Sequence, residues 1–292
     1  MLILAVLVAL AAAGCRIPGY YEGPVSQALA TSRQFTQRGV TALERGQKTD
    51  AEQWLAKAVK ACPGDPEARR NYAEALWERD KRKEAMAQLK EASRLAGDDA
   101  SLRVRLAEMY LVMGDLNMAA QNADQAISLD PKHGDAWAIR GRVRHAAGDL
   151  NGALADCQRA LGYVSDDRKM MNEVAELYLQ LRQPQAALQA AQNLAESYSP
   201  GEEPQRVMYL MGVACLAAGR SEDAVENLSI AATRDTPTVE ILYQLAEAEI
   251  AAGRPTRAAD AAQEALRLEP NHQPSRDLLG RIDLAQRTPT TR

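Results

Sequence analysis

The side chains of this 292-residue chain best suited to catalysis or metal binding are four cysteines and three histidines: Cys15, Cys62, Cys157, Cys215, His133, His145 and His272. A cysteine beside a histidine can act as a nucleophile, and closely spaced cysteines and histidines can bind zinc. Here their spacing is wide and irregular, and no motif of a serine hydrolase, a phosphate-binding loop, a zinc peptidase or a dinucleotide site occurs. The sequence therefore predicts no catalytic residue, no metal site and no cofactor.

Cys15 is a separate case, because it closes an apolar run at the amino terminus. Residues 1–13 contain no charged or polar side chain. This run fits the apolar region of an export signal better than a transmembrane helix, which needs about 20 residues. Its end, Ala12-Ala13-Gly14-Cys15, resembles the lipobox of bacterial lipoproteins, although that family usually has Leu where this chain has Ala12. The resemblance implies cleavage before Cys15 and acylation of its thiol; an ordinary secretory signal and an uncleaved anchor are the alternatives.

The composition favours closely packed helices and disfavours nucleic acid as a partner. Alanine is abundant and aromatic residues make up only 4% of the chain. Alanine is the best helix former and lets neighbouring backbones approach. Charged residues of both signs are interleaved along the chain, with a net charge of -4 and no basic stripe.

Small residues recur along the chain with a period of 34, broken by one three-residue insertion. The first column holds Gly or Ala throughout: Gly39, Ala73, Ala107, Gly141, Ala175, Gly212, Ala246 and Gly280. The second column, twelve residues further on, is entirely Ala: Ala51, Ala85, Ala119, Ala153, Ala187, Ala224 and Ala258. The third column holds Ala58, Ala92, Ala126, Ala160, Leu194, Ala231 and Ala265. Because small residues let helices approach closely, this period predicts repeated pairs of packed helices.

The period and the columns resemble the tetratricopeptide repeat, whose unit of 34 residues folds as two antiparallel helices. Glycine separates the two predicted helices in five repeats, while Asp80 and Arg182 stand there in the other two. Prolines such as Pro63, Pro131 and Pro270 follow the second helix. The resemblance covers residues 32–272. It implies an all-α, right-handed α-solenoid of about seven helix-turn-helix repeats with a C-terminal capping helix.

The predicted organisation begins with a signal peptide at 1–14, followed by the lipidated cysteine and a tether at 15–31. The tether contains two Pro and two Gly between Arg16 and Val25 and shows no helical period. The seven repeats are expected at about 32–65, 66–99, 100–133, 134–167, 168–204, 205–238 and 239–272. A capping helix at 273–287 and a disordered tail at 288–292 complete the chain.

In the tetratricopeptide family the first helices line a concave groove that binds extended peptides or helices, and this implies the candidate binding site. Projection of the first helices gives these partner-binding candidates: Tyr209, Val213, Leu216, Tyr243, Arg70, Glu74, Trp77, Arg142 and His145. The alternative is that these side chains pack partly between helices. Chaperone-binding members clamp a carboxylate with a Lys and Asn pair, but Thr36 and Val40 stand at those places in the first repeat.

These features predict a protein–protein interaction scaffold of the bacterial envelope that is not an enzyme, and an assembly or adaptor role. Its expected partners are other proteins and, through the lipid, a membrane; neither nucleic acid nor a small-molecule substrate is expected. The predicted location is the periplasmic side of a membrane, with the outer membrane favoured. The alternatives are a soluble secreted adaptor without lipid and a non-catalytic accessory subunit of an envelope enzyme.

Overall fold

A computed structural model describes residues 24–97 and 99–287, which contain fifteen α-helices and no strand. The chain divides into two compact units, one ending at Leu102 and the other beginning at Arg103. The predicted signal peptide, Cys15 and the predicted tail lie outside the described residues. No described helix combines the length and the apolar character needed to span a bilayer.

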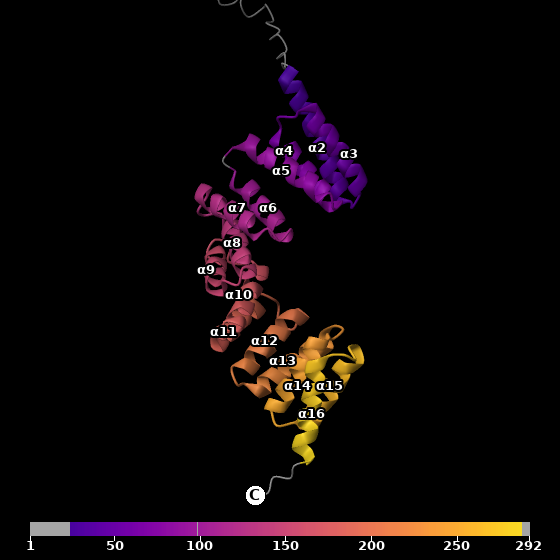
Figure 1. The fold of residues 1–292 in the computed structure, drawn as a ribbon, viewed down its shortest axis with the longest axis vertical. Helices are drawn as coiled ribbons and strands as arrows, with labels where there is room; N and C mark the ends of the chain where they lie inside the picture. Colours follow the sequence, from indigo (N-terminus) through magenta and orange to yellow (C-terminus); the bar gives the residue numbers. More distant parts are fainter. Residues whose placement is uncertain (1–23, 98, 288–292) are drawn as a thin grey trace, which may run out of the picture. The chain divides into compact units, whose positions relative to one another are not determined.

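Unit 1 contains two helical hairpins (Figure 1). The first consists of α2 (Pro24–Glu44) and α3 (Lys48–Ala61), and the second of α4 (Pro66–Glu78) and α5 (Arg82–Ala96). Helix α2 begins at Pro24, so the prediction that the tether extends to residue 31 is wrong. Proline suits the first turn of a helix, because its φ is already helical and its missing N–H has no partner there.

Unit 2 continues the same pattern, with each hairpin packed on the next (Figure 1). Its helices are α6 (Ala100–Val112, which starts at the boundary between the units), α7 (Leu116–Leu129), α8 (Gly134–Ala146), α9 (Leu150–Leu161), α10 (Arg168–Gln180), α11 (Pro184–Glu196), α12 (Gln205–Ala217), α13 (Ser221–Arg234), α14 (Val239–Ala251), α15 (Pro255–Leu268) and α16 (Gln273–Arg287). Helix α16 covers the last hairpin, because its Leu278 and Ile282 pack against Ala246, Ala258 and Ala262. The predicted all-α fold of seven helix pairs and a capping helix is confirmed.

The small residues of the repeat have the packing role that the period predicts. All seven alanines of the second column are fully buried. A Cβ atom on Gly141 would lie 2.7 Å from Cys157 Sγ, and one on Gly212 would lie 2.5 Å from Leu228 Cγ. Both distances are shorter than van der Waals contact allows, so a side chain at either position would push the two helices apart. Glycine in the first column therefore permits the close approach of the two helices within a hairpin.

The turns between paired helices require a left-handed backbone. Gly148, for example, has a φ of 84°, which glycine adopts without strain. Asp80 and Arg182 take the same region at 57° and 55°. Asp149, immediately after Gly148, accepts a hydrogen bond from the amide of Gly152 and so caps α9. A short turn and a capped second helix therefore follow directly from the local sequence.

Candidate interaction surface

The first helices of successive hairpins in unit 2 carry a surface that we call the A-helix face. It comprises Arg142, Glu173, Glu176, Arg206, Tyr209, Val213, Leu216, Tyr243, Glu247 and Arg281. Neighbouring first helices contact one another from α10 to α16. This arrangement brings side chains that are distant in sequence onto adjacent helices.

Ion pairs between neighbouring first helices connect this face. Arg142 Nε on α8 lies 2.9 Å from Glu173 Oε1 on α10, and Arg281 on α16 lies 2.6 Å from Glu247 on α14. Arg206 on α12 pairs with Glu176 on α10. These carboxylates and guanidinium groups are partly exposed, so each pair adds little stability. The pairs of Arg206 and Glu247 fix the direction of the two long side chains that contact the tyrosines.

Tyr209 and Tyr243 occupy equivalent positions on α12 and α14, and both are half-buried. The Arg206 guanidinium lies over the Tyr209 ring, 5.1 Å from its centroid. Tyr243 donates a hydrogen bond of 2.9 Å to Glu247, and its ring meets His272 edge-on at 5.5 Å. Burial raises the pKa of both phenols, and the hydrogen bond to Glu247 raises that of Tyr243 further. Both phenols therefore stay neutral at physiological pH, and both side chains remain partly exposed.

Val213 and Leu216 extend the apolar surface along α12. Both are partly exposed and pack against a buried cluster that includes Ala214, Cys215 and Leu228. The A-helix face thus has an apolar strip on α12 with the Tyr209–Arg206 pair at one end. Since each of these side chains is partly exposed, the structure combines the two interpretations of the sequence: they pack between helices and still present a surface.

Two other candidates in unit 2 lie on α8 and face α10. Arg142 forms the ion pair with Glu173, and His145 Nε2 lies 2.8 Å from Gln180 Oε1. His145 is otherwise exposed. Both side chains are therefore already engaged by the next hairpin, and a ligand would have to compete with those contacts.

The remaining candidates lie on α4 in unit 1. Arg70 is exposed, whereas Glu74 and Trp77 are half-buried, and the Arg82 guanidinium lies 5.4 Å from the centre of the Trp77 ring. The sequence did not single out a depression of about 400 Å³ between α2 and α4, lined by residues that include Arg33, Thr36, Gln37 and Glu67. Thr36 is 7% exposed, and its hydroxyl has no hydrogen-bond partner among the described residues. The four-residue spacing of Arg33 and Gln37 on one helix was the available signal.

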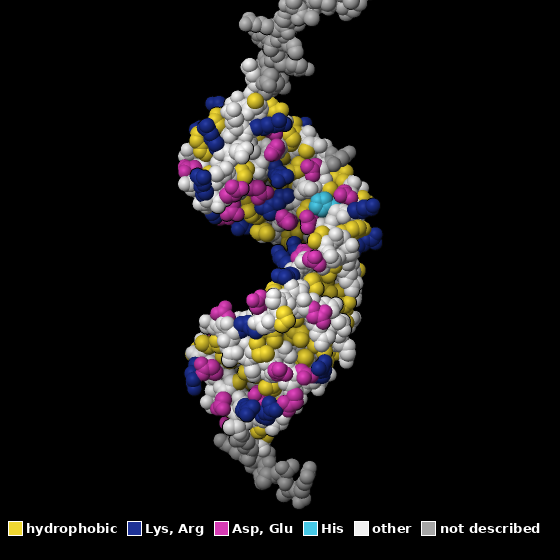
Figure 2. All heavy atoms as spheres, turned by 180° about the vertical axis from the view of Figure 1, so that it is seen from behind, with side chains coloured by type: hydrophobic (Ala, Val, Ile, Leu, Met, Phe, Trp, Pro, Cys, Tyr) yellow, Lys and Arg dark blue, Asp and Glu magenta, His cyan; other side chains and the backbone are white. Residues whose placement is uncertain are grey.

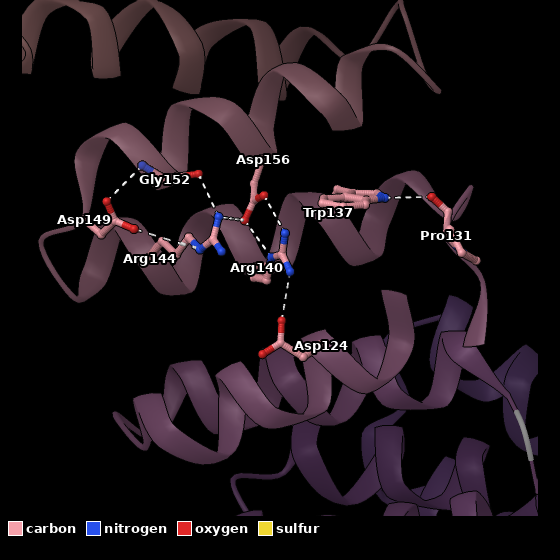
Figure 3. A network of polar contacts seen from close by, with 8 residues as sticks. All are labelled: Asp124, Pro131, Trp137, Arg140, Arg144, Asp149, Gly152 and Asp156. Carbon is pink, nitrogen blue, oxygen red and sulfur yellow. Dashed lines mark hydrogen bonds and ion pairs between the residues drawn. The ribbon is translucent and has the colours of Figure 1, made fainter. Parts of the chain in front are cut away.

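A buried ionic network in the fourth hairpin was also missed (Figure 3). Asp156 on α9 is 3% exposed and accepts two hydrogen bonds of 2.8 Å from Arg140 on α8. Arg144 lies 2.9 Å from Asp156, and Arg140 also reaches Asp124 on α7 at 2.9 Å. The hydrogen bonds to Asp156 raise the pKa of Arg140. The network joins three helices, so its role is to hold one hairpin to the next.

The surfaces and the network described above contain no cluster of cysteine thiols or metal ligands. Cys62, Cys157 and Cys215 are free thiols. Burial raises the pKa of Cys157 to about 12 and raises that of Cys215 as well, which keeps both thiols protonated. In the part of the chain that the structure describes, no three His, Cys, Asp or Glu side chains are arranged to hold a metal ion.

Comparisons with known proteins agree on the type of repeat. A family model described as tetratricopeptide repeat matches residues 104–168, 172–228 and 209–272, and a second model of the same description matches residues 42–103. A TPR repeat-containing protein of Pseudomonas aeruginosa is 43% identical over 64 residues, which are 22% of this chain; the aligned region spans 61% of that relative's length. Tetratricopeptide repeat protein 33 of Mus musculus is 22% identical over 233 residues, covering 75% of this chain and 88% of its own length.

Two solved structures share the fold at low sequence identity. PilW, described as a widely conserved type IV pilus biogenesis factor, superposes with a TM-score of 0.64 and 16% identity, covering 73% of this chain and 96% of its own. YrrB, described as a TPR protein with an unusual peptide-binding site, superposes with a TM-score of 0.59 and 17% identity, covering 66% and 97%. At such identities these likenesses concern the fold alone.

Proposed function

Because the chain belongs to the tetratricopeptide repeat family, we propose that it is a non-catalytic scaffold of the bacterial cell envelope that binds a segment of a partner protein on the A-helix face of unit 2. The observation that carries this proposal is the partly exposed apolar strip of Tyr209, Val213 and Leu216. Aromatic residues with a polar tip recur at binding hot spots because they offer a broad contact area and a hydrogen-bonding group.

The geometry favours an extended segment or a helix as the bound element. The tyrosines stand on adjacent first helices, so a ligand that crosses α12 and α14 can contact both. The charged side chains of Arg206 and Glu247 border the strip and can pair with polar groups of the ligand. This arrangement supports an assembly or adaptor role, as the descriptions of PilW and YrrB also suggest.

The proposed location rests on the lipobox-like sequence that ends in Cys15. Acylation there would attach the protein to the periplasmic side of a membrane, and we favour the outer membrane. Metabolic labelling with a fatty acid tests this part of the proposal. The wild type should incorporate label and remain in the membrane fraction, whereas Cys15→Ser should do neither; an unlabelled wild type would favour the soluble secreted adaptor.

The binding proposal predicts a specific effect of removing both tyrosines. Tyr209→Ala with Tyr243→Ala should weaken capture of the partner from detergent-solubilised cells by about tenfold or more, since truncation of a hot-spot side chain costs on the order of 2 kcal/mol. The matched control is Tyr163→Ala, which removes an exposed tyrosine from the turn after α9. Circular dichroism should show unchanged helicity for both proteins.

Two results would contradict this assignment. If capture is unchanged while helicity holds, the partner binds elsewhere, and the surface of α4 with Arg70, Glu74 and Trp77 is the next candidate. If the double variant unfolds, the two tyrosines serve mainly to pack the hairpins together.

A further inference from the structure

The outer side of the first hairpin presents an aromatic and cationic cluster that we call the N-terminal face. It consists of Phe35 and Arg38 on α2 and Trp54 and Lys57 on α3. The Phe35 and Trp54 rings stack with their centroids 5.7 Å apart. Arg38 lies 5.0 Å and Lys57 lies 4.2 Å from the centre of the Trp54 ring, so both cations are held over the indole.

Equivalent positions in later hairpins indicate which part of the repeat this face corresponds to. Each of its four residues has an equivalent three periods further on, in the fourth hairpin: Trp137, Arg140, Asp156 and Arg159. There Arg140 reaches back to Asp124 of the preceding hairpin (Figure 3). In the fifth hairpin, Val174 at the position of Arg38 packs against Ala153 and Ala160 of the hairpin before it. The position of Arg38 therefore lies on the side of a hairpin that stacks on its predecessor.

No helix precedes α2 within the described residues, and the first hairpin is unusually basic. Residues 24–62 carry six Lys and Arg but only three Asp and Glu, whereas residues 63–292 carry 28 and 35. Among the described side chains, Arg38, Arg45 and Lys57 have no carboxylate partner, while Glu52 pairs with Arg79 and Lys81 of the second hairpin. A depression of about 270 Å³ beside Trp54 is lined by Arg38 and Arg45 together with Asp50. These three cations are thus exposed and not paired with a described carboxylate.

We propose that the N-terminal face rests on an anionic phospholipid surface. Lys and Arg near such a surface are attracted to its phosphate groups, and Trp is favoured at the level of the headgroups. Pro24 follows Cys15 by only nine positions; an extended chain of that length spans at most about 30 Å. This inference rests on the proposed acylation of Cys15, which would keep the first hairpin within that distance of the bilayer. The face would then orient unit 1 on the membrane.

Vesicle binding of the full chain carrying Cys15→Ser tests the face without the lipid. We would compare sedimentation with vesicles of phosphatidylcholine alone and with vesicles of two parts phosphatidylcholine to one part phosphatidylglycerol. Binding should require phosphatidylglycerol and weaken as salt increases. Adding Arg38→Gln and Lys57→Gln should reduce the partition coefficient on the order of tenfold, because each cation near an anionic surface contributes about 1 kcal/mol.

The matched control is Arg257→Gln with Arg267→Gln, which removes two exposed cations from α15 and should leave binding unchanged. Brominated lipid should quench Trp54, and the quenching should fall when Trp54→Phe is introduced. Absence of binding to the anionic vesicles, or equal losses in the two double variants, would overturn the proposal. So would self-association through this face, seen as a dimer that the Arg38→Gln and Lys57→Gln changes dissociate. Failure of fatty-acid labelling in the wild type would instead refute the anchor, which is a separate result.

Discussion

The fourth hairpin, α8 and α9, and the sixth hairpin, α12 and α13, follow the same backbone plan but hold their helices together differently. In the fourth, Asp156 lies between Arg140 and Arg144, and Arg140 also pairs with Asp124 on α7. In the sixth, the position of Asp156 is Asn227, and the apolar side chains of Cys215, Val225 and Leu228 form the contact.

The surfaces of the two hairpins differ in the same way, with charged side chains in the fourth and apolar side chains in the sixth. The fourth offers Arg142 and His145, which are engaged by α10, while the sixth offers Tyr209, Val213 and Leu216 as a partly exposed strip. The acidic and basic side chains on the visible face of each unit are interspersed, without a field of one sign (Figure 2). The comparison indicates that the repeat backbone fixes the position of each side chain. The chemistry of that side chain then decides whether it joins two hairpins or stays partly exposed.

The largest expected effect is the loss of the buried carboxylate in the fourth hairpin. Asp156→Ala leaves the guanidinium groups of Arg140 and Arg144 without the buried carboxylate that they share, and breaking such a pair typically costs about 3–5 kcal/mol. Asn227→Ala, at the equivalent place in the sixth hairpin, should cost about 1 kcal/mol, because only a hydrogen bond to the Asp223 carbonyl is lost. Urea denaturation of both variants measures the difference; equal losses would remove the distinction between the hairpins.

A cavity in the sixth hairpin should have the next largest effect. Leu228 is fully buried against Gly212, so Leu228→Ala should lower the free energy of unfolding by about 3 kcal/mol. Cys157 has the same place in the fourth hairpin, and Cys157→Ala should cost about 1 kcal/mol because far less volume is removed. Thermal melting would contradict the comparison if the cysteine change proved the more damaging.

The smallest expected effect is a dependence of stability on alkaline pH that should be stronger in the wild type than in Cys157→Ala. Burial raises the pKa of Cys157 to about 12, above its ordinary value of 9.0. The folded state therefore favours the neutral thiol, and this contribution to stability is complete below pH 9 and lost as the pH rises toward 12. Cys157→Ala should show a smaller decline in melting temperature from pH 8 to 10.5 than the wild type. Parallel declines would mean that the thiol ionises as easily in the folded protein as in the unfolded chain.

The sequence predicted the helix pairs and their turns because small residues at a fixed period are needed wherever successive helices pack closely. Gly141 and Gly212 are needed where two backbones approach, and Gly148 where φ is positive. The start of α2 was missed, because proline and glycine between residues 16 and 25 concealed a helix that begins on a proline. The Arg140–Asp156 network was missed for a different reason. In a chain with a quarter of its residues charged, only three-dimensional structure shows which charges are buried together.

Site-specific photocrosslinking tests the central claim, that unit 2 binds its partner through the A-helix face, most directly. A photoreactive phenylalanine analogue at Val213 on α12 should crosslink to the partner in intact cells. The same analogue at Glu226, exposed on α13 of the same hairpin, should not. Crosslinks from position 226 without any from position 213 would place the partner on the second helices and contradict the account.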